Sequence, residues 1–185
     1  MNTTWLCAVI FPFLMLLLVG NALVFDETAY KALLRPGAVN ATMQLLGYFQ
    51  GNAEIPTIFD RNEQSHLADV KQVISLLRWV SLALLAVFLL LLFKADTGAA
   101  FTKGFTLLIA LVLLSALIPF GTVFSYFHKM LFAEGTWLFP ANSMLILLYP
   151  ETFFQAFLAY ILSLTMAFSA VFAVYGYTMP DLSNK

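Results

Sequence analysis

SYFHKMLFAEGTWLFPANSMLILLYPETFF, residues 125–154, is the stretch that separates two long apolar runs and decides how they are arranged. Its histidine, His128, is one of only two in the chain, and the other, His66, precedes a different apolar run. The stretch is too rich in aromatic residues for a simple turn, since it contains Tyr126, Phe127, Phe132, Trp137, Phe139, Tyr149, Phe153 and Phe154. Whether the two imidazoles meet therefore decides which chemistry the chain can support.

The composition excludes an ordinary soluble domain. Of the 185 residues, 62% are hydrophobic and 10% are charged, whereas soluble domains carry about 25% charged residues. The formal net charge of −1 offers no basic surface for a nucleic acid. The single cysteine, Cys7, excludes an internal disulfide, and its apolar surroundings favour a packing role.

Four apolar runs are long enough to cross a bilayer, which needs about 20 residues in a helix. We predict spans over about residues 4–25, 73–93, 105–127 and 152–177, the third of which contains Pro119. The first run lacks the basic residues of a signal peptide, so we expect it to be retained. The chain is thus predicted to be a single all-α membrane domain, 1–185, with a small cap from about residues 26–72 and 128–151.

The two histidines should lie on the same side of the membrane. His66 precedes the second predicted span and His128 follows the third, so two crossings separate them. Asp60 and Glu63 form a capping box that starts the helix of His66, and this helix should continue into the second span. Lys94 and Lys103 in a short loop weakly favour a cytoplasmic position for that loop, and hence an extracytoplasmic cap.

Several interpretations of these residues stay open. Two histidines can each be structural, or they can serve together as base and acid near neutral pH. Glu63 or Asp69 could complete a metal site with them, but Glu63-x-x-His66 has no matching second motif, so we expect no metal. Arg78 lies inside the second span, where it either snorkels or contacts lipid or substrate oxygens.

The aromatic loop is either an interfacial belt or a shaped pocket. Its clustering around His128 and its two proline turns favour a pocket. We therefore expect the substrate to contact Tyr126, Trp137 and Phe139, with Glu63, Asp69 and Arg78.

Two segments carry a family resemblance. EQSHLADVKQV, residues 63–73, and the quoted 125–154 stretch, joined to four spans at this spacing, resemble the bacterial lipoprotein intramolecular transacylase family. The shared patterns are His-Leu-x-Asp-Val and His…Trp-x-Phe-Pro…Leu-x-Pro-Glu-x-Phe-Phe. The resemblance implies two catalytic histidines, here His66 and His128, and a cap outside the cytoplasm of a bacterial cell membrane.

The reaction implied by the resemblance moves an acyl chain within a diacylglyceryl lipoprotein. The chain passes from the glyceryl sn-2 oxygen to the α-amine of the N-terminal cysteine, which gives the lyso form. We expect no cofactor, no nucleic acid and no obligate protein partner, only the lipoprotein and membrane lipids. A non-enzymatic membrane protein whose cap binds a partner or lipid is the alternative, and a metal-dependent membrane hydrolase is a third interpretation.

Overall fold

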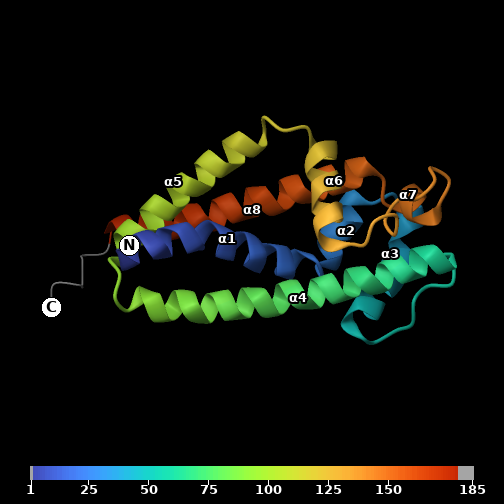
Figure 1. The fold of residues 1–185 in the computed structure, drawn as a ribbon, viewed down its shortest axis with the longest axis horizontal. Coiled ribbons are helices and arrows are strands. Elements are labelled where there is room, and N and C mark those ends of the chain that lie inside the picture. The colour runs from blue at the N-terminus through green and yellow to red at the C-terminus, as the bar shows by residue number, and fades with distance from the viewer. Residues whose placement is uncertain (1, 179–185) are drawn as a thin grey trace. The chain divides into compact units, whose positions relative to one another are not determined.

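The computed structural model describes residues 2–178, which contain α-helices and no strand. Figure 1 shows the helices in chain order. They are α1 Thr3–Leu23, α2 Glu27–Leu33, α3 Pro36–Gln50, α4 Arg61–Leu92, α5 Thr97–Ser115, α6 Phe120–Leu131, α7 Met144–Leu148 and α8 Glu151–Thr178. Four of them, α1, α4, α5 and α8, are long and apolar enough to span a membrane. The prediction of an all-α protein with four membrane spans is confirmed.

One predicted boundary was wrong. The third apolar run, predicted as one helix over 105–127, ends as α5 at Ser115, and a separate helix, α6, begins at Phe120. Pro119 is the cause, because proline has no N–H to donate and disfavours helical geometry in the residue before it. His128 consequently lies on a short helix of its own, still after the third span.

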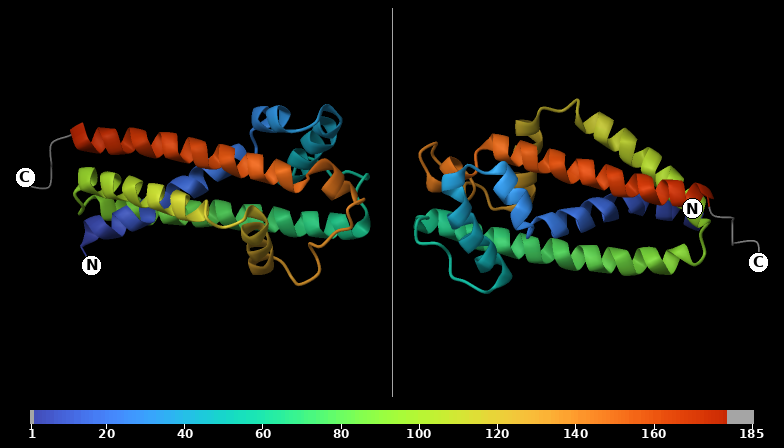
Figure 2. Two further views of the ribbon diagram at one scale, coloured as in Figure 1. Left: turned by 90° about the horizontal axis from the view of Figure 1, so that it is seen from above. Right: turned by 180° about the vertical axis from the view of Figure 1, so that it is seen from behind.

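The residues gather into two compact units, each built from segments that are far apart in sequence. Among the described residues, unit 1 comprises 2–21, 77–118 and 160–178, and unit 2 comprises 22–76 and 119–159. Figure 2 gives two further views of the helices from which the units are built.

Unit 1 is a helix bundle packed around Phe11 of α1. The Phe11 ring lies 6.1 Å from Phe88 of α4, 5.1 Å from Phe101 of α5 and 6.0 Å from Phe172 of α8, measured between ring centroids. Gly104 of α5 lets these helices approach, because a Cβ there would lie 2.8 Å from the Phe11 ring. Aromatic packing and a small residue therefore hold the bundle together. This is usual for helices in a bilayer, where the hydrophobic effect contributes little to the association of one helix with another.

Unit 2 contains α2, α3, α6, α7 and the first turns of α4 and α8. Its apolar core comprises Leu45, Phe59, Leu67, Leu145, Tyr149 and Phe153. A buried hydrogen bond of 2.8 Å joins the hydroxyls of Thr42 on α3 and Tyr149 after α7. Lys71 of α4 donates to the carbonyl of Tyr48 on α3 at 2.6 Å. The segments predicted to form a cap therefore fold together as one packed unit.

The four spans predict which segments share a side of the membrane. In a Cys7→Ala background, cysteines at the exposed positions Asn52 and Glu134 should react with an impermeant thiol reagent from the same side. A cysteine at exposed Lys94, in the turn between α4 and α5, should react from the other side. Labelling of positions 52 and 134 from opposite sides would contradict the four-span arrangement.

Candidate active site

His66 is fixed by the helix start that precedes it. The predicted capping box is confirmed: the Asp60 amide donates to the Glu63 carboxylate at 2.8 Å, and the Glu63 amide donates to the Asp60 carboxylate at 2.9 Å. His66 follows on the first turns of α4 and is only 8% exposed. Its Nδ1 atom is buried and has no hydrogen-bond partner among the described residues. A buried polar atom left in this state is costly unless something else satisfies it.

His128 is held by its own helix, α6. Its Nδ1 atom lies 2.8 Å from the carbonyl oxygen of Phe124, one turn earlier. Because a carbonyl oxygen can only accept, Nδ1 must carry the proton in this contact. In the neutral ring the lone pair is then on Nε2, so the free nitrogen of His128 is the one able to accept a proton.

The two imidazoles lie in one cluster of rings. Their centroids are 6.3 Å apart, with the planes inclined by 24°. Phe132 packs beside both of them, 4.7 Å from His66 and 5.5 Å from His128. Phe139 lies 5.5 Å from His66, and Trp137 lies 5.0 Å from His128. We call these five residues, with Phe124 at 4.0 Å from His128, the histidine cluster.

The cluster keeps His128 in its neutral form. Burial lowers the pKa of His128 from its ordinary value of about 6.5, and the hydrogen bond to the Phe124 carbonyl opposes that shift only in part. A neutral imidazole at pH 7 is a competent base. A second nitrogen, Nε1 of Trp137, is also buried without a partner among the described residues. It can only donate, so it offers a free hydrogen-bond donor beside His128.

Glu63 is buried, and the backbone holds its carboxylate. It is 2% exposed, and both of its carboxylate oxygens accept from backbone amides. Oε2 accepts from Asp60, and Oε1 accepts from Leu145 of α7 at 2.9 Å, across 82 residues of sequence. Because both oxygens accept from backbone amides, Glu63 positions the helix of His66, and the expectation that it contacts substrate stays a prediction.

Other residues predicted to contact substrate lie at different places in unit 2. Trp137 and Phe139 lie in the histidine cluster. Asp69 is half-buried on α4, close enough for its charge to act on the His66 ring. Tyr126 is 70% exposed, and the Lys129 ammonium lies 5.8 Å from the centre of its ring, so its contact with substrate stays a prediction.

Arg78 lies in unit 1, on an exposed part of α4. Its side chain forms no ion pair within residues 2–178. Its role toward substrate or lipid therefore stays a prediction.

Two cluster residues were missed as site residues by sequence reasoning, Phe124 and Phe132. Both lie four residues from His128, which places Phe124 on the same face of α6 and Phe132 at the C-cap that follows the helix. That signal was hidden, because 105–127 was interpreted as a membrane span and the helix start at Phe120 was not foreseen.

Within residues 2–178, no group of three or more His, Cys, Asp or Glu side chains is arranged to hold a metal ion.

Comparison with known proteins gives the family and the fold. A family model described as lipoprotein intramolecular transacylase Lit matches residues 5–154. A structure of membrane-integral Lit from Bacillus cereus is similar with a TM-score of 0.71 and 22% identity, and the match covers 95% of this chain and 92% of that one. The same protein with one histidine replaced by arginine gives a TM-score of 0.73 and 21% identity, over 95% and 89% of the two chains.

A search of curated proteins gave no match. At these identities, the solved structures establish the likeness of fold alone. The family model, however, covers most of the sequence. The chain therefore belongs to the lipoprotein intramolecular transacylase family, and it is a multi-pass membrane acyltransferase.

Proposed function

We propose that this enzyme moves an acyl chain from the glyceryl sn-2 oxygen of a diacylglyceryl lipoprotein to the α-amine of its N-terminal cysteine. The observation that carries the proposal is the enclosure of both histidines in one aromatic cluster, with ring centroids 6.3 Å apart. At this spacing both rings can contact one reacting group, since reacting atoms must come within about 3–3.5 Å. The non-enzymatic alternative gives no reason for that arrangement.

His128 is the proposed proton carrier. Its Nε2 lone pair accepts a proton from the cysteine nitrogen as that nitrogen bonds to the ester carbonyl carbon. The same imidazolium then donates the proton to the sn-2 oxygen as the ester C–O bond breaks. One N–C bond forms, one C–O bond breaks and one proton moves from nitrogen to oxygen, so the products are an N-acyl amide and a free glyceryl hydroxyl.

His66 and Trp137 are the proposed donors to the carbonyl oxygen. The negative charge that develops there in the transition state needs preorganised hydrogen bonds in a site without water. Nδ1 of His66 and Nε1 of Trp137 are both buried and unpartnered among the described residues, and both rings lie near His128. No described protein group satisfies these two nitrogens, and a bound carbonyl oxygen could accept from both, which supports a binding role over a purely structural one.

The aromatic side chains have two proposed tasks. The attacking nitrogen and the ester belong to one molecule, so the substrate must fold into a medium-sized ring that closes poorly in solution. Phe132, Phe139 and Trp137 would hold it folded. They would also exclude water, which competes with the amine for the ester. We place the cap on the extracytoplasmic side, supported by Lys94 in the turn between α4 and α5 and by Lys103 near the start of α5, which lie at the opposite ends of these spans.

Histidine replacements test the roles separately. His128→Ala and His128→Asn should both reduce the rate by about 10²–10⁴-fold, since neither supplies a base. His66→Ala should cost about 10²–10³-fold. His66→Asn should retain clearly more activity than His66→Ala, because its amide can still donate.

Substrate and product are isomers of equal mass, so the assay is fragmentation mass spectrometry of a synthetic diacylglyceryl lipopeptide incubated with purified enzyme. Full activity of either alanine variant would remove that histidine from the mechanism.

Trp137→Phe tests the donor alone, since it keeps an aromatic ring and removes the N–H. We expect the rate to fall by about 10²-fold or more, as for loss of one oxyanion donor, with unchanged accumulation in the membrane. Trp5→Phe, in unit 1, is the matched control and should retain full activity. If Trp137→Phe had normal activity per molecule, or failed to accumulate, Trp137 would be a packing residue only.

A further inference from the structure

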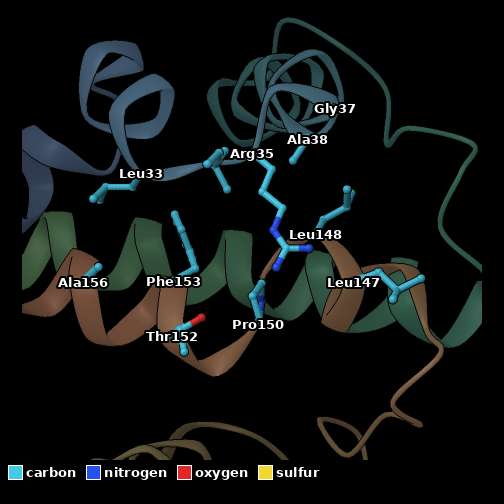
Figure 3. A pocket seen from close by; sticks show the side chains of 11 residues that line it. Leu33, Arg35, Gly37, Ala38, Leu147, Leu148, Pro150, Thr152, Phe153 and Ala156 are labelled. Carbon is cyan, nitrogen blue, oxygen red and sulfur yellow. The ribbon is translucent and has the colours of Figure 1, made fainter.

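A cavity in unit 2 is distinct from the histidine cluster. It is a cavity of about 300 Å³ between the end of α2, the start of α3, α7 and the start of α8. Its walls are mainly apolar, with Leu33, Leu148, Phe153 and Ala156 among them. Figure 3 shows these side chains around the groove, with Arg35 reaching from the α2–α3 turn toward Pro150. None of the residues in the histidine cluster lines it.

The groove is positively charged at one place. Arg35 is the only charged residue among the described residues that line it, and its guanidinium forms no ion pair within residues 2–178. Arg35 also precedes α3, whose N-terminus has no side-chain cap. Pro150 and Thr152, at the start of the 28-residue α8, line the opposite wall. The positive end of α3 thus reinforces the guanidinium, a combination that favours an anion, whereas Glu151 in the first turn of α8 offsets the positive end of that helix.

The position of the groove indicates what kind of anion it takes. Thr152, Phe153 and Ala156 belong to the first turns of α8, which is a candidate membrane span. The groove therefore starts at the polar edge of a span and continues along apolar side chains. An amphiphile with an anionic head and a hydrocarbon tail matches both parts.

We propose that this groove binds one phospholipid of net negative charge, with its phosphate against Arg35 and an acyl chain along Leu33, Phe153 and Ala156. The reacting group of a lipoprotein substrate is an amine, which is cationic when protonated and would be repelled by Arg35, so the groove is not a second amine site. The proposal does not depend on the chemistry assigned to the histidines.

Native mass spectrometry of the purified full chain tests the proposal. The protein is equilibrated in detergent with phosphatidylglycerol or, separately, with phosphatidylcholine. We expect one phosphatidylglycerol to be retained in preference to phosphatidylcholine. Arg35→Gln should weaken its retention about 5-fold or more, the value of one basic contact to an anionic lipid. Arg35→Lys should restore part of it. Ala156→Trp, which fills the exposed end of the groove, should also weaken it.

Arg61→Gln is the matched control, because Arg61 is exposed in the same unit and does not line the groove. It should retain the lipid as the unmodified chain does. Equal retention by the Arg35→Gln and Arg61→Gln variants, or equal retention of both lipids by the unmodified chain, would overturn the proposal. So would competition by glycerol 3-phosphate at the same concentration as the lipid, since the acyl chain would then contribute nothing.

Discussion

The buried carboxylate of Glu63 is the constraint on which unit 2 depends. It accepts from the amide of Asp60 at 2.8 Å and from the amide of Leu145 at 2.9 Å, at 2% exposure. A buried charge is tolerated only when its lone pairs are satisfied, and hydrogen bonds to a carboxylate are among the stronger ones. Since Glu63 lies one turn before His66, the same contacts that satisfy the charge also fix where His66 stands relative to α7. Packing of Leu67 and Leu145 in one apolar core reinforces this attachment.

The histidine cluster is organised so that one imidazole is satisfied and the other is not. His128 uses Nδ1 for the Phe124 carbonyl, which leaves Nε2 as its free nitrogen. His66 keeps Nδ1 unpartnered, and Trp137 keeps its N–H unpartnered, among the residues described. Aromatic rings surround all three, so these free nitrogens lie in apolar surroundings. Unpartnered nitrogens of this kind are expected where a transition state, rather than the resting protein, supplies the hydrogen-bond partner.

Local signals in the sequence were sufficient to predict much of the fold and part of the candidate site. The capping box of Asp60 and Glu63 and the four apolar spans follow from spacing and composition, and the structure bears out both. Pairing of the histidines was foreseen from counting crossings. The break at Pro119 was not, because hydropathy continues through it and only the backbone restriction of proline reveals it. The second bond of Glu63, to Leu145, was also beyond prediction, since it joins residues 82 positions apart.

Measuring the tautomer of His128 tests the proposed chemistry most directly. With only two histidines in the chain, ¹⁵N-histidine labelling in lipid bilayers gives a spectrum that His66→Asn resolves to a single ring. The account predicts a neutral His128 at pH 7, with a pyrrole-type Nδ1 and a pyridine-type Nε2. The ring should become an imidazolium only below its ordinary pKa of about 6.5, because burial disfavours its charged form. A proton on Nε2, or an imidazolium at pH 7, would contradict the assignment of His128 as the group that takes the proton from the attacking amine.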